Sequence, residues 1–568
     1  MEGPNTGASL FRDGKLVAVA EEERFSRVKR ATDQFPSSAI RYCLKEANIR
    51  LRDVSTIASA WDHSKYPDQM NSLMGSIPGR SQDEHADDAE RMIHTFLSPG
   101  LTRFAINVGM KKIDADAECD VVFYPHHLCH AASVHYLSGF DESSIIVLDG
   151  SGEEISTSTW FGQGEDINPL DTWKLPDSIG WFYASLTEYL GFKAYSGEGK
   201  VMGLAPYGKP NSEVAEKLRQ FCSLDAESGY RVDPTFVYYG KRSFSRHYTD
   251  KLVELLGPPR TPESELDAYH LSIAYETQRL LEEVSTQLTR DLLAKTNCGN
   301  LCISGGVAMN CKMNGLLSRL EGVESVFINP ASYDSGAGIG AGLLAVRDKG
   351  ESPTKNVLAH AYWGPSFTDG EIEDALSHCH LDYRRSDNVA EEAAELLAQG
   401  KIIGWFSGRA EFGARALGAR SILANPLLPD VKDRVNARVK YREAFRPFAP
   451  SLVEEARLDY MTQSSDSPFM LLAYEFDEEF QEQFPGVVHV DGTVRPQTVS
   501  RKTNPTYWEL ISAFGRKTGH PIILNTSFNV RGEPIVNTPL DAVRCYFSTG
   551  MDGLVIGSFI LEKRPGRG

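Results

Sequence analysis

Two histidines four residues apart are the first residues in this sequence whose types and spacing suggest chemistry. His126 and His130 lie in the run Tyr-Pro-His-His-Leu-Cys-His that starts at Tyr124. If this run is helical, both imidazoles face one side, about 6 Å apart at Cβ. The hydrophobic stretch 144–148 follows and ends in Asp149 and a glycine loop. Two imidazoles and a strand-end carboxylate predict a divalent-metal site, although this spacing also occurs in helices that bind no metal.

The same arrangement, a hydrophobic strand that ends in glycines or an acid before a helix, occurs twice more. Residues 301–306 end in the pair Gly305 and Gly306, and residues 326–334 end in Asp334. Ligands in open α/β sheets gather at such strand ends, and the N–H groups of a Gly-Gly turn can face phosphate. Each feature alone is equally well explained as an ordinary loop. Together they predict a nucleotide with a metal, in the pattern of the actin-like ATPase superfold.

The C-terminal third gathers cations in glycine-rich or apolar surroundings. Arg415 lies in a glycine-rich run, and Arg446 lies between phenylalanine and proline residues. A guanidinium in such a setting would be partly buried and would need an anionic partner. Lys440 and Arg495 add charge, and the small polar residues 525–527 offer contacts to phosphate or ribose. These features predict a second, anion-binding site, whereas solvated surface charge is the alternative for each cation alone.

The length and composition of the chain indicate which kinds of protein it can be. The chain has 568 residues, 41% of them hydrophobic, which allows a large core and, at about 100–200 residues per domain, two to four domains. Its net charge of −18 argues against a nucleic-acid partner. Nine scattered cysteines predict reduced thiols and a cytoplasmic location. The sequence predicts no membrane span and no signal peptide, because it has neither a run of about 18 apolar residues nor the expected N-terminal pattern.

Hydrophobic periodicity predicts the elements that position these residues. We expect a hairpin with its turn at Asp13 and Gly14, and a polar linker at residues 348–362. The segments 65–100 and 225–265 contain the fewest motifs and are the expected determinants of specificity. Helices are expected at 36–49, 266–295, 369–379 and 388–400, and strands at 8–23 (the hairpin), 120–124, 144–149, 156–163, 301–304, 324–329 and 401–406.

Seven motifs in a fixed order make the chain resemble the O-carbamoyltransferases of natural-product biosynthesis. That group contains the nodulation-factor, cephalosporin, ansamycin and aminoglycoside carbamoyltransferases. The motifs extend over nearly the whole chain and are highly specific together. They are Glu21–Arg27, Pro125–Ser133, Gly197–Gly208, Gly305–Asn310, Glu411–Ser421, Arg446–Pro450 and Leu524–Asn529.

The resemblance implies an α/β protein of two domains. An actin-like (ASKHA) domain over residues 1–355, similar to the tRNA threonylcarbamoyltransferase, would precede a YrdC-like domain over residues 356–568. In the second domain, carbamoyl phosphate and ATP, with Mg(II), would give carbamoyl-adenylate. In the first, a hydroxyl of a secondary metabolite would take the carbamoyl group.

The resemblance also assigns residue roles by matching position. Four residues would hold an iron(II)-like metal, although this ligand set does not separate iron from zinc or manganese; they are His126, His130, Asp149 and Asp334. A second set would hold carbamoyl phosphate and the ATP phosphates: Arg415, Lys440, Arg446, Arg495 and Ser527. A third set would line the nucleotide in the first domain: Lys29, Glu198, Gly203, Gly305, Gly306 and Asn310. Direct catalytic roles would fall to His126, His130, Lys440 and Arg446.

The chain departs from the family at its start. Family members usually begin with an apolar strand and a His-Asp-Ser sequence, whose place is taken here by Pro4-Asn5-Thr6. We expect a misassigned start or a truncation, which in-frame upstream codons for an apolar strand would support. The departure also leaves the general base without an assigned residue.

Three other functions are weighed against carbamoyl transfer to a small molecule. Threonylcarbamoyl transfer to tRNA is disfavoured by the net charge and by the absence of a basic stripe. A sugar kinase of the ASKHA fold would need neither the histidine pair nor the arginine-rich C-terminal part. A non-catalytic ATP-binding regulator would tolerate loss of the C-terminal cations, which are all present. The acceptor and the oligomeric state, a homodimer included, stay open.

Overall fold

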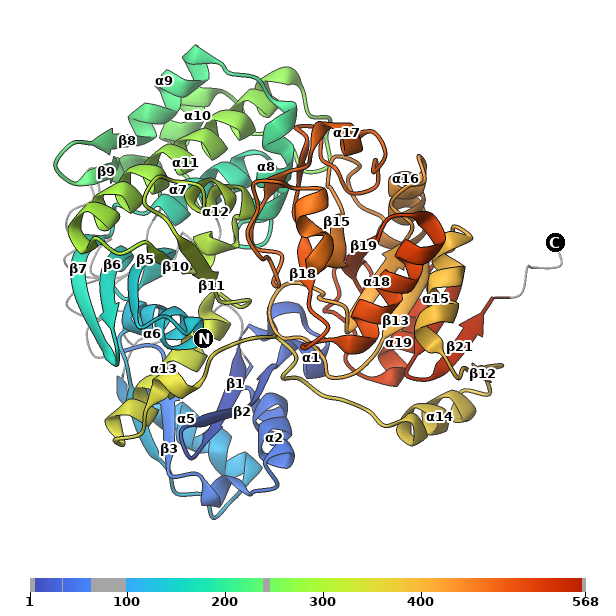
Figure 1. Ribbon diagram of the computed structural model, residues 1–568. Helices are drawn as coiled ribbons and strands as arrows, with labels where there is room; N and C mark the ends of the chain where they lie inside the picture. Colours follow the sequence, from blue (N-terminus) through green and yellow to red (C-terminus); the bar gives the residue numbers. More distant parts are fainter. Residues whose placement is uncertain (1–5, 33, 63–98, 239–245, 564–568) are drawn as a thin grey trace. The chain divides into compact units, whose positions relative to one another are not determined.

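The computed structural model describes residues 6–32, 34–62, 99–238 and 246–563, and the chain divides into two compact units. The first unit consists mainly of Ala8–Val17 and Leu44–Leu358, and the second mainly of Ala18–Cys43 and Ala359–Gly568. Both units mix helices with strands (Figure 1). The division after residue 358 lies close to the predicted boundary. The segment 18–43 differs from the prediction, because it groups with the C-terminal unit.

A five-stranded sheet forms the centre of the first unit, in the order β11-β10-β5-β6-β7. β10 runs parallel to both β5 and β11, whereas β5, β6 and β7 form an antiparallel meander. The carboxyl ends of β5 and β10 therefore meet at one edge, where Asp149 and the Gly305-Gly306 turn follow. The strands are β5 (Glu142–Gly152), β6 (Ile155–Gln163), β7 (Asp166–Lys174), β10 (Asn300–Ser304) and β11 (Ser325–Ile328).

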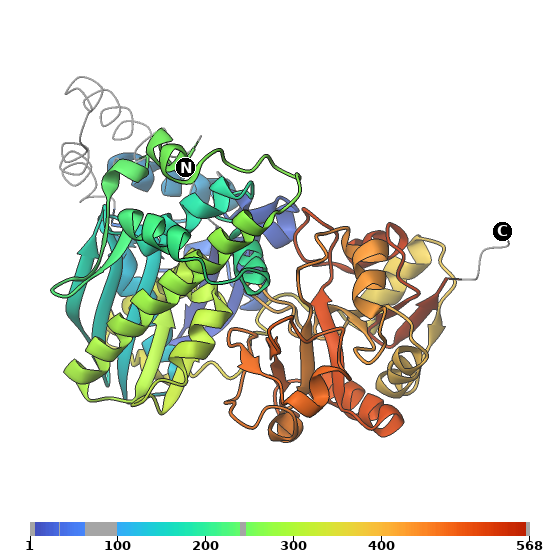
Figure 2. The same ribbon diagram turned by 90° about the horizontal axis from the view of Figure 1, so that it is seen from above.

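Helices cover both faces of this sheet. Ala131 and Val134 of α6 pack against Ile145 and Val147 of β5 in one buried cluster. Because side chains alternate along a strand, the residues between them point to the opposite face. There β5 contacts α7 and α11, and Figure 2 shows the long helix α11 beside the strands. These helices are α6 (His126–Ser138), α7 (Ile179–Tyr189) and α11 (Ala268–Thr296).

Helix α13 (Asp334–Asp348) packs against α6 at very close range. A Cβ atom added at Gly340 would lie 1.8 Å from the carbonyl oxygen of Cys129, so only glycine fits at this crossing. The close approach brings the first residue of α13, Asp334, toward the first turn of α6.

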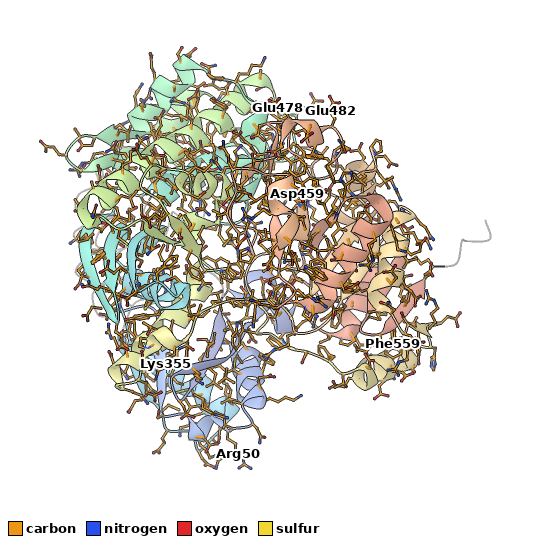
Figure 3. The ribbon with its side chains drawn as sticks, in the orientation of Figure 1. Arg50, Lys355, Asp459, Glu478, Glu482 and Phe559 are labelled. Atoms are coloured by element: carbon orange, nitrogen blue, oxygen red, sulfur yellow. The ribbon has the colours of Figure 1, made fainter. Side chains whose placement is uncertain are left out.

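An eight-stranded mixed sheet forms the centre of the second unit, in the order β12-β21-β20-β13-β14-β19-β15-β18. At its edge Phe559 of β21, labelled in Figure 3, contacts Tyr383 with ring centroids 5.4 Å apart. The strands are β12 (Arg384–Arg385), β13 (Ile403–Phe406), β14 (Arg420–Ala424), β15 (Ala449–Val453), β18 (Gln497–Val499), β19 (Ile522–Ser527), β20 (Gly553–Ile556) and β21 (Phe559–Glu562). The helices around it include α14 (Asp369–His378), α15 (Val389–Ala398), α16 (Val431–Val435), α18 (Pro505–Thr518) and α19 (Pro539–Phe547).

Shorter elements complete the described chain. Two-stranded pairs are formed by β1 with β2, β3 with β4, β8 with β9 and β16 with β17. These strands are β1 (Gly7–Arg12), β2 (Lys15–Glu21), β3 (Thr56–Ser59), β4 (Asp120–Phe123), β8 (Cys222–Asp225), β9 (Gly229–Val232), β16 (Tyr474–Glu475) and β17 (Thr493–Val494). The remaining α-helices are α1 (Glu23–Ser26), α2 (Ser37–Glu46), α5 (Pro99–Ile113), α8 (Glu198–Leu204), α9 (Ser212–Phe221), α10 (Asp250–Leu256), α12 (Cys311–Leu317) and α17 (Glu478–Gln481).

Most predicted elements are confirmed. The hairpin turns at Asp13 and Gly14, both with positive φ (51° and 72°), and the helix predicted at 266–295 is α11. All nine cysteines are free thiols. Within the described ranges, no helix is both long and apolar enough to cross a membrane. Most of the predicted specificity segment 65–100, and Pro4-Asn5, lie outside the described residues.

Two glycines of α13 give a matched test of the α6–α13 contact. We expect Gly340→Ala to lower the free energy of unfolding by about 1–3 kcal/mol, because its methyl group meets backbone. Gly338, in the same helix, has open space at its Cβ, so Gly338→Ala should stabilise the protein by about 0.5–1 kcal/mol. Urea unfolding of both variants measures this. Equal effects would contradict the packing described.

Candidate functional sites

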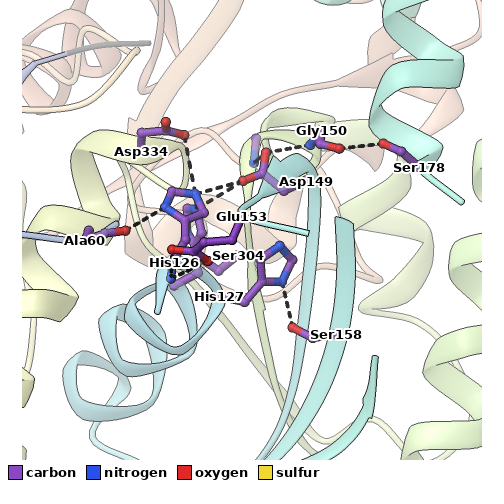
Figure 4. A network of polar contacts seen from close by, with 12 residues as sticks. Ala60, His126, His127, Asp149, Gly150, Glu153, Ser158, Ser178, Ser304 and Asp334 are labelled. Carbon is purple, nitrogen blue, oxygen red and sulfur yellow. Dashed lines mark hydrogen bonds and ion pairs between the residues drawn. The ribbon is translucent and has the colours of Figure 1, made fainter. Parts of the chain in front are cut away.

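The two predicted histidines lie side by side at the start of α6. Pro125, with φ −56° and ψ 134°, ends the segment after β4, so the helix begins at His126. The Nε2 atoms of His126 and His130 lie 3.0 Å apart, and both side chains are fully buried. Figure 4 shows His126 with its contacts to Ala60, Asp149 and Asp334. Each Nδ1 is turned away, to the carbonyl oxygen of Ala60 at 2.9 Å and to Oγ of Ser304 at 3.1 Å. Since the Ala60 carbonyl accepts the Nδ1 proton of His126, the Nε2 lone pair of His126 faces inward, where it can accept a proton or bind a metal ion.

Asp149 joins the imidazoles to the end of the sheet. Its Oδ2 lies 3.3 Å from the Nε2 atom of each histidine. Its Oδ1 accepts hydrogen bonds from the N–H groups of Gly150 at 2.7 Å and Gly306 at 3.2 Å. Oδ1 therefore fixes the end of β5 to the Gly305-Gly306 turn, and Oδ2 faces the two imidazoles.

Asp334 completes a four-residue cluster. Its Oδ1 lies 3.9 Å from Nε2 of His126, and one ligand atom from each of the four residues lies within 4.8 Å of the others. The structure thus brings together all four predicted ligands. Two imidazole nitrogens and two carboxylates fit a divalent transition metal, and the convergence of their four ligand atoms is the observation that favours one.

The electrostatics of this cluster favour a cation at its centre. Burial lowers the pKa of His126, but its hydrogen bond to Asp149 and the charge of Asp334 outweigh this and raise the pKa to about 9. Burial and the neighbouring His126 lower the pKa of His130. Although burial opposes it, hydrogen bonds from the two histidines hold the pKa of Asp149 well below its usual range. The ion-free cluster therefore holds a proton, for which a metal ion would compete.

Two glycines make room for this arrangement. Gly305 has φ +91°, and a Cβ atom there would lie 2.1 Å from the carbonyl oxygen of Leu148. A Cβ atom at Gly152 would lie 2.4 Å from Cδ2 of His126. The glycine runs predicted as phosphate loops thus also let the β5 and β10 ends approach the imidazoles.

Two neighbours of the cluster were not predicted. Glu153 is buried with φ 50°, and its carboxylate accepts hydrogen bonds from the N–H groups of His126 (3.1 and 3.2 Å) and Asp62 (2.8 Å). The ring of Trp61 lies 4.3 Å from that of His126. Glu153 could have been predicted as a neighbour of the cluster, because it is an acid only four residues after Asp149. Trp61 lies far from the cluster residues in the sequence, and no spacing indicates it.

The other residues predicted to line a nucleotide in the first unit have structural partners. The Asn310 side chain caps α12 through the N–H of Met313 (3.0 Å) and exchanges two hydrogen bonds with Gln278 (3.1 and 2.9 Å). Glu198 begins α8 and accepts a hydrogen bond from the N–H of Tyr195, and Gly203 is buried in the same helix. Their contact with a nucleotide stays a prediction.

In the second unit, Lys440 is the centre of a different site. It ends a π-helix, Asn436–Lys440, and its buried ammonium contacts Oγ of Ser527 (3.1 Å) and Oδ1 of Asn529 (2.8 Å), along with both backbone carbonyls. Burial lowers the pKa of Lys440 well below its usual range, and the charges of Arg442 and Arg446 lower it further. The predicted partners Lys440 and Ser527 are in contact.

Further guanidinium groups crowd this lysine. Burial, with the charges of Arg446 and Arg495, lowers the pKa of Arg442 to about 9. Burial also lowers the pKa of Arg446, against the attraction of Glu443 at 3.7 Å. We call Lys440, Arg442, Arg446 and Arg495 the cation cluster. The lowered pKa values of Lys440, Arg442 and Arg446 indicate positive charge that an anion would offset. Arg442 belongs to the cluster although it was not among the predicted site residues.

Lys29 lies near this cluster and not where it was predicted. It belongs to the segment that groups with the second unit, whereas the prediction placed it on a nucleotide in the first. Loss of hydration outweighs the attraction of Glu23 and lowers the pKa of Lys29, and the charge of Arg446 lowers it further. Segment 18–43 interrupts the first unit in sequence and groups with the second, so the predicted domain boundary does not hold for Lys29, and its contact with a nucleotide stays a prediction.

The loop that carries Arg415 is held by two acids. Oε1 of Glu411 accepts hydrogen bonds from the N–H groups of Leu417 (2.7 Å) and Arg420 (3.2 Å). Glu21 accepts one from the N–H of Gly413 at 3.2 Å. The motifs at 21–27 and 411–421 thus form one structure within the second unit.

Family comparisons cover both units. The model described as carbamoyltransferase N-terminus matches residues 5–343, and the one described as carbamoyltransferase C-terminus matches residues 394–563. The chain belongs to the carbamoyltransferase family. It is therefore an enzyme that transfers carbamoyl groups.

The relatives of this carbamoyltransferase match most of its chain and most of their own. Nodulation protein NolNO of Sinorhizobium fredii is 37% identical, over 99% of this chain and 80% of that protein. Nodulation protein NolO of Bradyrhizobium diazoefficiens is 40% identical over 78% and 79%, and an uncharacterized Synechocystis protein is 36% identical over 98% and 95%. The crystal structure of T. kodakarensis HypF aligns with 45% of this chain and with 40% of the HypF chain. The aligned residues are 16% identical, and the TM-score is 0.25.

The four-residue cluster should bind one divalent ion per carbamoyltransferase chain. Loss of a residue that only hydrogen-bonds to a metal ligand weakens metal binding by roughly 10–100-fold. Because Asp334 would be a ligand itself, we expect Asp334→Asn to weaken iron(II) or manganese(II) binding by more than this. Tryptophan fluorescence, to which Trp61 contributes with its ring 4.3 Å from that of His126, and elemental analysis measure binding. His135→Ala, on the same helix but bonded to Ser143 and Gly164, is the control. Unchanged binding in Asp334→Asn would contradict the site.

The cation cluster should bind pyrophosphate in a pH-dependent way. Because burial lowers the pKa of Lys440, its charge is lost at a lower pH than that of an ordinary lysine. Stabilisation by bound pyrophosphate should therefore be largest near neutral pH and fall as the pH rises. Without an anion the sign reverses, since the unfolded chain binds more protons and unliganded stability increases with pH.

Thermal unfolding with and without inorganic pyrophosphate, from neutral to alkaline pH, measures this stabilisation. Lys440→Arg should move its decline to higher pH. A stabilisation that does not vary with pH in the wild-type protein would rule out the expected role of Lys440.

Proposed function

We propose that this carbamoyltransferase is ATP-dependent and acts through carbamoyl-adenylate. The observation that carries the proposal is the pairing, in one chain, of a crowded cation cluster with a separate buried site of two imidazoles and two carboxylates. The first suits phosphorylated substrates, and the second suits a metal ion. A one-site carbamoyl transfer from carbamoyl phosphate would need only the first.

The first step would take place in the second unit. Carbamoyl phosphate gives up its phosphate to water, and the resulting carbamate oxygen attacks the α-phosphorus of ATP. The bond between the α-phosphorus and the bridging oxygen breaks, and pyrophosphate leaves with the electron pair. Lys440, Arg446 and Lys29 would offset the charge that develops on the phosphoryl oxygens. Mg(II) would accompany the ATP.

The second step would take place in the first unit. The acceptor hydroxyl attacks the carbamoyl carbon, loses its proton, and AMP leaves with the electron pair of the cleaved C–O bond. A divalent ion held by His126, His130, Asp149 and Asp334 would supply Lewis-acid stabilisation of the leaving phosphate. The N–H of Gly306 bonds to Oδ1 of Asp149 and so orients the carboxylate with Oδ2 toward the imidazoles, and Glu153 holds the start of α6.

We also propose a fold family for each unit and a class of acceptor molecule. A meander of β7, β6 and β5 continued by the parallel strands β10 and β11 supports an ASKHA-like first unit. The second unit would be YrdC-like. The acceptor would be a hydroxyl-bearing secondary metabolite, on the strength of the motif resemblance.

Pyrophosphate release tests the first step. Wild-type protein with ATP should release pyrophosphate only when carbamoyl phosphate is added. Arg446→Ala should lower this rate by about 10²–10³-fold, the size expected for loss of a charge-stabilising donor. Arg516→Ala, which removes exposed ion pairs to Glu391 and Glu509, is the arginine control and should change little. Release that does not depend on carbamoyl phosphate would count against the proposal.

A further inference from the structure

A buried ion pair in the segment 18–43 has no part in the reaction proposed above. Glu21 and Arg24 are both buried, and Nη2 of Arg24 lies 3.1 Å from Oε2 of Glu21. Both residues belong to the motif Glu21–Arg27 and group with the second unit. Burial of two charges costs hydration free energy that their mutual attraction alone often does not recover. The other contacts of this pair therefore indicate what it does.

The ion pair holds one glycine of the loop 411–421 by both of its backbone polar groups. Oε2 of Glu21 accepts a hydrogen bond from the N–H of Gly413 at 3.2 Å, and Nη2 of Arg24 donates to the carbonyl oxygen of Gly413 at 2.7 Å. The same two side-chain atoms form the ion pair, so the contacts close a ring. Gly413 has φ 94°, which favours glycine. The pair thus fixes the direction in which the chain leaves this residue.

The loop is anchored again four residues later, at Leu417. Its N–H donates to Oε1 of Glu411 at 2.7 Å, and its carbonyl oxygen accepts a hydrogen bond from the hydroxyl of Tyr362 at 2.7 Å. Gly413 and Leu417 are both buried. Residues 414–416 therefore form a short tip between two fixed ends.

This tip presents a single guanidinium group. It reads Ala414-Arg415-Ala416, in which Ala414 is exposed and Arg415 is half-buried. Because the backbone on both sides is anchored, the side chain of Arg415 starts from a fixed position and loses less freedom when it binds a ligand. A guanidinium group binds planar oxyanions and phosphate through two parallel hydrogen bonds, for which orientation matters. The geometry of the tip therefore suits a phosphate group.

We infer that Arg24, together with Glu21, is a positioning residue that orients Arg415 toward the phosphate group of carbamoyl phosphate. Arg24 acts through the backbone of Gly413 and touches no substrate itself. The inference rests on the proposed function for the identity of the anion. It gives the motif Glu21–Arg27 a role in substrate binding that the proposed reaction does not assign.

A double-variant comparison of carbamoyl phosphate binding tests the inference in the full-length protein. Calorimetry should show that Arg24→Ala and Arg415→Ala each weaken binding about tenfold, as expected for groups in one network. The variant that carries both substitutions should bind no more weakly than Arg415→Ala alone, because the ion pair then has no guanidinium to orient. A general loss of stability would instead weaken binding in both backgrounds.

A second variant and a control separate positioning from folding. Glu21→Gln keeps the size of the side chain and removes the ion pair, and its effect should depend on Arg415 in the same way. Arg260→Ala is the control, because Arg260 is as buried as Arg24 (9% against 8% exposed) and also donates to backbone carbonyls, those of Leu190 and Ser264. It lies in the first unit. Arg260→Ala should lower the melting temperature and leave carbamoyl phosphate binding unchanged.

Three results would overturn the inference. They are an Arg24→Ala effect that is as large in the Arg415→Ala background as in the wild type, unchanged binding in Arg415→Ala, and unchanged binding in both Arg24→Ala and Glu21→Gln. These measurements need neither ATP nor turnover. Absence of carbamoyl phosphate-dependent pyrophosphate release would therefore refute the proposed reaction and leave the positioning role standing.

Discussion

Two imidazole nitrogens held 3.0 Å apart in a buried site are the constraint on which the first unit depends. Their outer nitrogens are bonded to Ala60 and Ser304, so both Nε2 atoms face one point beside Asp149. A divalent ion at that point would bind both nitrogens and the carboxylate. The surrounding elements converge on the same place: β5 ends there, the β10 turn bonds to Asp149, and α13 begins there. The close glycine contacts of α6 and β5 allow this convergence.

The second unit has the opposite electrostatic character, because its site is built from buried cations. Its cations come from a π-helix, the segment after it and the turn between β17 and β18. Burial destabilises the charge of Lys440, Arg442 and Arg446. Such a cluster is stabilised by an anion, whereas the first-unit cluster is stabilised by a cation. Carbamoyl-adenylate is chemically suited to both, since it is made from anions and leaves a phosphate group behind. The opposite electrostatics of the two sites are the physical basis for assigning them different steps.

The sequence predicts those parts of the sites whose geometry is local. The spacing of His126 and His130 depends only on helix periodicity, and Asp149 depends only on a strand and its end. Asp334 was likewise predicted from a strand end and the cations from their glycine-rich or apolar surroundings, and the resemblance to a family assigned their roles. By contrast, Glu153 and Trp61 reach His126 through the tertiary fold, which periodicity does not encode. The grouping of segment 18–43, which contains Lys29, with the second unit was also not predicted, because it depends on tertiary contacts and not on chain order.

The central claim is that the two units perform separate steps, and the most direct test is the fate of the intermediate in His130→Ala. We expect this variant to consume ATP and carbamoyl phosphate and to accumulate carbamoyl-adenylate, which mass spectrometry of a quenched reaction would detect. Its transfer to an acceptor hydroxyl should be lost. If His130→Ala forms no carbamoyl-adenylate but still transfers the carbamoyl group from added carbamoyl-adenylate, the assignment of steps to the two sites is wrong.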